Sequence, residues 1–222
     1  MRKYLLHILI ISFVFLLAPT AHVASYAVDI EEAKEEVRKN PDDASAHLNL
    51  GVAYGELGKY EDAIRSYKQA ISIDPDDADV HANLGDAYAM LGTPKKPGVY
   101  KKAIKACMQA IRIDPDLAKA HNNLGNAYRG SGKIDEAIES YKQALRIAPD
   151  YSDAQISLGY AYAMLGKHEE ATEPCKQAIK IEPDYAEAHL SLGLTYLVLN
   201  DISSALDQYK ILKKLDTEKA NL

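Results

Sequence analysis

The sequence lacks the short motifs with which many enzymes bind nucleotides or metal ions. It contains no G-x-G-x-x-G, no phosphate-binding loop, no C-x-x-C and no H-E-x-x-H. Its carboxylates alternate with lysine and arginine, as they do on ordinary solvated helix faces. The sequence therefore predicts a protein with no enzymatic activity, no metal site and no cofactor.

Cysteine is scarce, with two residues in the 222-residue chain. Cys107 and Cys175 occupy the same place in a recurring pattern, two recurrences apart. If neighbouring helices are about 8–10 Å apart, the two thiols are separated by roughly 20 Å, whereas a disulfide needs Cα atoms within about 7 Å. We therefore expect two buried, unpaired thiols that fill apolar space; a redox role is the alternative.

An excess of basic residues is also missing, because the formal net charge is −6. Nucleic-acid binding needs a basic face, and attachment to an anionic membrane surface needs a polybasic segment. The charge balance therefore argues against both, and it leaves a protein or peptide as the expected partner.

Long hydrophobic runs are confined to the N-terminus. Arg2 and Lys3 precede an apolar run, Leu5–Leu17, and small residues follow it. This order predicts a signal peptide over residues 1–27. Thirteen helical residues span about 20 Å, less than the roughly 30 Å of a bilayer core. An uncleaved anchor is the alternative, and only this alternative attaches the protein to a membrane. Both place the rest of the chain outside the cytoplasm, in the periplasm or cell envelope if the source is bacterial.

An eight-residue phrase recurs five times in the remaining chain. It reads HLNLGVAY at 47–54, HANLGDAY at 81–88, HNNLGNAY at 121–128, QISLGYAY at 155–162 and HLSLGLTY at 189–196. Its glycines are separated by 34, 40, 34 and 34 residues, and they are Gly51, Gly85, Gly125, Gly159 and Gly193. Five prolines keep the same spacing: Pro41, Pro75, Pro115, Pro149 and Pro183. A fixed period of this length predicts a solenoid of stacked units.

The recurring residues resemble the tetratricopeptide repeat (TPR) family, in which L-G-x-x-Y is followed by A-x-x-x-F and a proline. The first copy has Leu50, Gly51, Tyr54, Ala63, Tyr67, Ala70 and Pro75, whereas the fifth departs at Leu212 and Thr217. The resemblance covers residues 44–219. It implies an all-α fold, a right-handed superhelical solenoid of antiparallel helix pairs.

Four histidines stand where the family prefers an aromatic residue: His47, His81, His121 and His189. Adjacent members are expected about 10 Å apart, too far to share a metal ion bound at about 2 Å. We therefore expect these histidines to be packing residues.

The pattern also predicts the organisation of the chain. A capping helix or tether is expected over residues 28–43, followed by repeats over 44–77, 78–117, 118–151, 152–185 and 186–219, and a tail over 220–222. The second repeat carries six extra residues, 93–98 (TPKKPG), which predict a surface loop and not a helix extension. This loop is either a tolerated insertion or a functional element.

Pro174 predicts a local bend in the second helix of repeat four, with a functional hinge as the alternative.

The resemblance implies a concave groove lined by the first helix of each repeat. By register, its lining residues in the first three repeats are Leu48, Val52, Gly55, Ala82, Asp86, Ala89, Asn122, Asn126 and Arg129. In the last two repeats they are Ile156, Tyr160, Ala163, Leu190, Leu194 and Leu197. The middle of this groove is expected to be polar and its C-terminal part apolar. Exposed apolar area marks an interaction site unless another helix or a second copy covers it.

Some family members hold the terminal carboxylate of a peptide with lysine, asparagine and arginine side chains. The matching positions here are Leu48, Val52, Asn83, Lys119 and Asn123. Only Asn83 and Lys119 fit, so the sequence argues against this carboxylate chemistry and against the cytoplasmic chaperone partners that it implies.

The leading functional hypothesis is a non-catalytic adaptor of the periplasm or cell envelope that binds a protein or peptide segment in the groove. One alternative is a self-assembling scaffold. It would associate through the last helix, whose Leu206, Ile211, Leu212 and Leu215 are followed by no polar capping helix. Another is a membrane-tethered assembly factor for a secretion, pilus or outer-membrane system, if the N-terminal segment is retained.

Overall fold

The computed structural model describes residues 23–93 and 96–219, and the side chains of residues 30–93 and 96–215. These residues form eleven α-helices and no strand. Within the described part of the chain, we find no helix with the length and apolar character needed to cross a membrane. Most of the expected signal peptide or anchor and the whole tail at 220–222 lie outside the described residues. The first helix, α2 (Val23–Lys39), begins before the expected boundary at residue 28.

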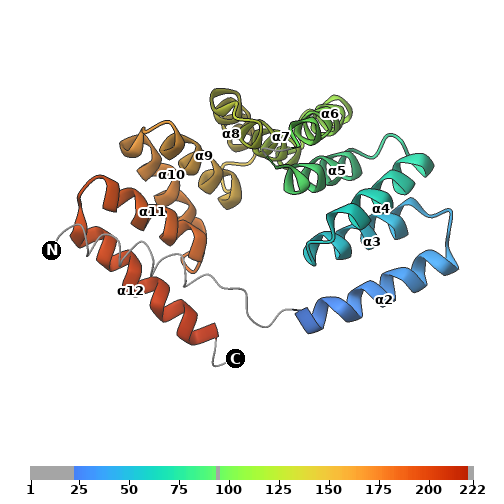
Figure 1. Cartoon of the computed structure of the whole chain (residues 1–222), viewed down its shortest axis with the longest axis horizontal. Helices are drawn as coiled ribbons and strands as arrows, with labels where there is room; N and C mark the ends of the chain where they lie inside the picture. The colour runs from blue at the N-terminus through green and yellow to red at the C-terminus, as the bar shows by residue number, and fades with distance from the viewer. Residues whose placement is uncertain (1–22, 94–95, 220–222) are drawn as a thin grey trace. The chain divides into compact units, whose positions relative to one another are not determined.

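The helices divide into two compact units, and Figure 1 labels them along the chain. The N-terminal unit ends at Ile147 and contains α2, α3 (Ala44–Glu56), α4 (Tyr60–Ile73), α5 (Ala78–Leu91), α6 (Pro97–Ile113), α7 (Ala118–Gly130) and α8 (Ile134–Ile147). The C-terminal unit begins at Ala148 and contains α9 (Ser152–Met164), α10 (His168–Ile181), α11 (Ala186–Val198) and α12 (Ile202–Lys219). Inside each unit the two helices of a repeat pack against each other, as expected for an all-α solenoid.

Glycine on the first helix of a repeat lets the second helix approach closely. A methyl group at Gly125 would lie 2.5 Å from Cε1 of Tyr141, and one at Gly159 would lie 2.7 Å from Sγ of Cys175. Gly51 faces Tyr67 and Gly85 faces Cys107 in the same way. Because no Cβ fits in this space, the tyrosine or cysteine side chain of the second helix fills it.

The two thiols are buried and unpaired in the structure, as expected. Cys107 and Cys175 take the place that Tyr67 and Tyr141 have in the first and third repeats. Burial raises the pKa of Cys107 to about 12 and also raises the pKa of Cys175. Both side chains therefore remain protonated and behave as small apolar groups.

The recurring histidines fix the turn between repeats. Nε2 of His47, His81 and His121 lies 2.9 Å from the carbonyl oxygen of Pro41, Pro75 and Pro115, and Nε2 of His189 lies 2.8 Å from that of Pro183. A carbonyl only accepts, so each Nε2 donates. Gln155 makes a longer bond of 3.4 Å to Pro149 in the fourth repeat. These side chains thus do more than pack, because each closes the loop that leads into its own helix.

Aspartates contribute to the helix starts. Asp43 accepts from the backbone N–H of Ser45 at 2.9 Å, and Asp77 accepts from that of Val80 at 3.1 Å. Asp77 is therefore the N-cap of α5.

The turn inside four of the five repeats uses a left-handed residue. Gly58, Gly132 and Gly166 have positive φ angles there, and Asn200 takes the equivalent place in the fifth repeat with φ of 62°. Asparagine is one of the few residues other than glycine that adopt this conformation readily. The second repeat differs because its insertion lengthens the turn.

The insertion is only partly a loop, which corrects the expectation for residues 93–98. Its last two residues, Pro97 and Gly98, belong to the first turn of α6, which has 17 residues where α4, α8 and α10 have 14. Proline suits this position because it has no N–H to satisfy and its φ is already helical. Residues 94 and 95 lie outside the described part.

Pro174 does not interrupt its helix. It is buried within α10, which is continuous from His168 to Ile181. The local bend expected at this residue stays a prediction.

Candidate protein-binding site

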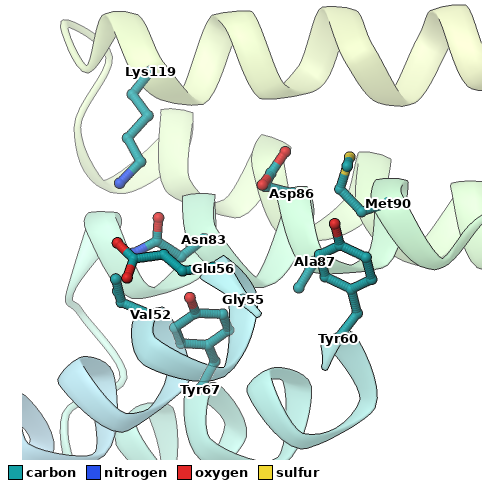
Figure 2. A pocket seen from close by; sticks show the side chains of 10 residues that line it. All are labelled: Val52, Gly55, Glu56, Tyr60, Tyr67, Asn83, Asp86, Ala87, Met90 and Lys119. Carbon is teal, nitrogen blue, oxygen red and sulfur yellow. The ribbon is translucent and has the colours of Figure 1, made fainter. Parts of the chain in front are cut away.

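The N-terminal unit has a hollow on the face formed by its first helices. The hollow has a volume of about 330 Å³, and Figure 2 shows the side chains around it. Its lining residues are Val52, Gly55, Glu56, Tyr60, Tyr67, Asn83, Asp86, Ala87, Met90 and Lys119. They come from α3, α4 and α5, together with one lysine of α7 that reaches down toward these helices in Figure 2.

Helical spacing brings these side chains to one face. Val52 and Glu56 are four residues apart on α3, and Asp86 and Met90 are four residues apart on α5, which places each pair one above the other. Glu56 and Met90 were not predicted from the sequence. Each lies one helical turn after a predicted groove residue, Val52 or Asp86. This spacing is the signal that could have found them.

Asp86 is the central charged group of the hollow. It is half-buried, and among the described residues it has no hydrogen bond or ion pair. Burial raises the pKa of Asp86, and the ammonium group of Lys119 opposes this shift. Nζ of Lys119 also lies 3.5 Å from Oδ1 of Asp79, with which it forms an ion pair.

Tyr67 contributes a phenol at the base of the hollow. Burial raises its pKa, and the charges of Asp86 and Glu56 raise it further. A methyl group at Gly55 would lie 3.8 Å from the hydroxyl oxygen of Tyr67, an ordinary contact. The glycine therefore leaves the space above this hydroxyl open.

The other predicted groove residues of this unit have internal roles. Leu48 packs against the core cluster that includes Ala63 and Val80. Asn126 accepts a hydrogen bond of 2.8 Å from the hydroxyl of Tyr141, and Nε of Arg129 donates to the same hydroxyl at 3.3 Å. These two polar side chains thus hold the tyrosine that packs against Gly125.

Asn122 does not line an open groove, which corrects the prediction for this residue. Its exposed fraction is 4%, and its Oδ1 is buried with no hydrogen-bond partner among the described residues. Ala82 occupies the same helical position and is fully buried against Ala110 and Ala120 of the second and third repeats. This position therefore packs between repeats and does not face a partner.

Leu197 requires the same correction in the C-terminal unit. Its exposed fraction is 5%, because it lies in a core cluster with Ala205 and Leu212 of α12. Leu190 and Leu194 are half-buried against this cluster, and Ile156 is half-buried as well. The last helix pair thus uses most of the apolar surface that the sequence assigned to a partner.

Several large apolar side chains are exposed on the C-terminal unit. Tyr160 and Met164 of α9 are each 50% exposed, and Val198 of α11 is 60% exposed. Leu165 and Leu199, the C-cap residues that follow these two helices, are also exposed. Of these residues, Tyr160 was predicted from the sequence.

The last helix is less open than its composition suggests. Leu212 and Leu215 of α12 are buried, whereas Leu206 and Ile211 are each 37% exposed. The two exposed side chains are five positions apart, which places them about 140° apart around the helix axis. They therefore do not form one continuous apolar stripe.

The histidines, cysteines and carboxylates of the described residues do not gather into a group of three or more that could hold a metal ion.

The comparisons with known proteins identify the class of the chain. A family model described as "TPR repeat" matches residues 54–92, 96–132, 125–166 and 159–200, and one described as "Tetratricopeptide repeat" matches residues 33–65. The chain belongs to the tetratricopeptide repeat family. The comparison with curated protein sequences gives no match.

Solved structures of TPR proteins share the fold. A crystal structure of MamA is 26% identical with a TM-score of 0.61, and the match covers 78% of this chain and 98% of that chain. The thermophilic TPR protein TTC0263 of Thermus thermophilus is 26% identical with a TM-score of 0.67, and the match covers 80% and 97%. YrrB, described as a TPR protein with an unusual peptide-binding site, is 19% identical with a TM-score of 0.54, and the match covers 87% and 100%. The last similarity concerns the fold alone.

Proposed function

We propose that this protein is a non-catalytic adaptor that binds an extended segment of a partner protein in the hollow around Asp86. The observation that carries the proposal is a hollow on the first-helix face that contains a half-buried carboxylate with no hydrogen-bond donor among the described residues. Buried polar groups are normally paired, so the hollow offers an acceptor that a partner can satisfy. Membership of a family of protein-interaction scaffolds supports this role.

The exposed apolar side chains of α9 and α11 form a second contact area in this proposal. Met164 and Val198 are large, exposed and one repeat apart in equivalent positions. Methionine adapts its shape to different partners, and exposed apolar patches mark interaction surfaces. Leu197 is buried and is therefore left out of this contact area, whereas Tyr160 stays within it.

Site-specific photo-crosslinking tests the proposal with a matched pair of positions. Met90 lines the hollow and is 56% exposed, whereas Met108 lies on the second helix of the same repeat and is 55% exposed. A photoreactive residue at position 90 is expected to capture one partner segment, mapped by mass spectrometry, and the same residue at position 108 is not.

A filling substitution makes this test specific for the hollow. Gly55→Leu adds a side chain where a Cβ meets only the Tyr67 hydroxyl, and Gly98→Leu adds one where nothing lies within 4 Å. The adduct from position 90 should disappear in the first variant and persist in the second. Equal adducts from positions 90 and 108, or an adduct insensitive to Gly55→Leu, would exclude the hollow as the binding site.

We also propose that the protein is exported to the periplasm or cell envelope. The support is the sequence itself, with Arg2 and Lys3 before a thirteen-residue apolar run. The intact mass of the protein isolated from its source distinguishes cleavage near residue 27 from retention of the segment. A cleaved product supports a free adaptor, and an uncleaved one supports the membrane-tethered assembly factor.

Self-assembly through α12 is the second candidate. The exposed Leu206 and Ile211 favour it, but their separation around the helix leaves no single face for a second copy. Sedimentation over a range of concentrations tests it, because a self-assembling scaffold must show a concentration-dependent mass. A Leu206→Lys variant that keeps the same mass dependence would remove α12 from consideration.

A further inference from the structure

We infer that the hollow of the N-terminal unit receives a basic side chain, arginine or lysine, from the partner segment. This inference rests on the proposed function and names the chemistry of its ligand. It combines three properties of the hollow: a half-buried carboxylate to which no described residue donates a hydrogen bond, an excess of negative charge, and aromatic and apolar walls next to that charge.

The carboxylate of Asp86 lacks the hydrogen bonds that usually accompany burial. It is half-buried on α5, and none of the described residues donates to it. A carboxylate in this situation loses part of its hydration, and the ammonium group of Lys119 offsets only part of that loss. A guanidinium or ammonium group from a partner supplies charge-assisted hydrogen bonds, which are stronger than those from neutral donors.

The charges around the hollow favour a cation over an anion. Two carboxylates, Asp86 and Glu56, and one ammonium group, that of Lys119, line it. The ammonium group is shared with Asp79 at 3.5 Å, which leaves the hollow with negative charge. An acidic ligand would meet repulsion from both lining carboxylates, whereas a basic one is attracted by both.

The walls of the hollow suit the long stem of a basic side chain. Tyr60 and Tyr67 of α4 and Met90 of α5 line the same space as Asp86. Aromatic faces attract guanidinium and ammonium groups, and apolar walls contact the methylene stem. A volume of about 330 Å³ lies at the lower end of the range for ligand pockets. It admits side chains of an extended segment and not a folded domain.

Peptide pools provide a test that does not require the natural partner. Nine-residue pools with a fixed central Arg, Lys, Gln, Leu or Glu and mixed neighbours are titrated onto the full-length protein, with fluorescence anisotropy as the readout. The Arg and Lys pools are expected to bind roughly tenfold more tightly than the Gln and Glu pools.

Two carboxylate variants assign this preference to one residue. Asp86→Asn should bring the Arg and Gln pools to equal affinity, whereas Asp116→Asn should leave the preference unchanged. Asp116 is an exposed carboxylate of the same unit, in the turn before α7, so the two variants have the same net charge.

The outcomes separate this inference from the proposed function. Binding that is blocked by Gly55→Leu but shows no preference for basic residues overturns the inference and keeps the hollow as a peptide site. A preference for basic residues that survives Asp86→Asn also overturns it. Binding that is unaffected by Gly55→Leu overturns both.

Discussion

Gly125 on α7 and Tyr141 on α8 share one space: a methyl group on the glycine would lie 2.5 Å from Cε1 of the tyrosine ring. The hydroxyl of the same tyrosine donates to Asn126 at 2.8 Å. One edge of the ring therefore packs against α7, its hydroxyl is hydrogen-bonded to the same helix, and the side chain is fully buried. Equivalent pairs occur in the first, second and fourth repeats, with Cys107 and Cys175 in place of tyrosine in the second and fourth.

Gly125→Ala is expected to destabilise the N-terminal unit by about 1–3 kcal/mol, because the added methyl overpacks the contact between α7 and α8. Urea unfolding followed by circular dichroism measures the change. Gly98→Ala is the control, because nothing lies within 4 Å of a Cβ at that position. Equal stability of the two variants would show that the helix pair separates easily.

Leu197→Ala is expected to cost about 2–4 kcal/mol of folding free energy, because the side chain is buried between α11 and α12. Its neighbour Val198 is 60% exposed, so Val198→Ala should change stability by less than about 0.5 kcal/mol. The same unfolding measurement compares the two. A small effect at position 197 would return this residue to the surface that the sequence had assigned to it.

The histidines at the repeat starts should contribute unequally. His189 is buried and lies 2.8 Å from the Pro183 carbonyl and 2.7 Å from Oε1 of Gln208. His81 is more exposed, and its ring bonds to the Pro75 carbonyl at 2.9 Å. Replacement by alanine is expected to cost roughly 1–2 kcal/mol at position 189 and about half as much at position 81. Thermal unfolding of both variants checks the order, and a larger loss at His81 would contradict it.

The fold was predictable because its determinants are local and repeated. Gly51 and its equivalents mark the close approach of two helices, and Pro75 and its equivalents mark the turns between repeats. The proline carbonyl contact of His47 was not predicted, because its partner lies outside the helix whose periodicity was analysed. Pro97 was assigned to a loop because proline usually ends a helix, whereas here it begins one.

The candidate site was only partly predictable. Helical register identified Val52, Asp86 and Tyr160 as accessible positions on the first helices of their repeats, but it does not give the depth to which neighbouring repeats cover each position. Asn122 and Leu197 lie on covered positions and are buried. Lys119 was considered only as part of a carboxylate-binding pattern, and its ion pair with Asp79 depends on contacts between repeats that the sequence does not show.

The thiols should resist alkylation while the protein is folded. Burial raises the pKa of Cys107 to about 12 and raises that of Cys175 as well, so near pH 8 little of either is present as the reactive thiolate. Iodoacetamide should leave the native mass unchanged within minutes and add two groups after unfolding in guanidinium. Rapid modification of one native thiol would show that its helix pair opens, and it would revive the redox interpretation of that cysteine.

Asp86→Asn should stabilise the folded protein at neutral pH while it removes the preference for basic peptides. Burial raises the pKa of Asp86 above its unfolded value, with Lys119 opposing the shift and with Glu56 and Tyr67 also lining the hollow. The folded state therefore retains this proton where the unfolded chain has released it. The stability contributed by the protonated form is present at acidic pH and is lost as the pH rises through the raised pKa.

Asp86→Asn removes this loss, so we expect the free energy of unfolding at neutral pH to rise by roughly 0.5–1 kcal/mol. The rise is limited because the half-buried side chain keeps part of its hydration. Urea unfolding at a series of pH values should show the gain shrinking toward acid, and Asp116→Asn should show no such gain at neutral pH. If Asp86→Asn instead destabilises the protein at neutral pH, the carboxylate is already satisfied within the fold. The hollow then has no unmet acceptor for the cation of a partner.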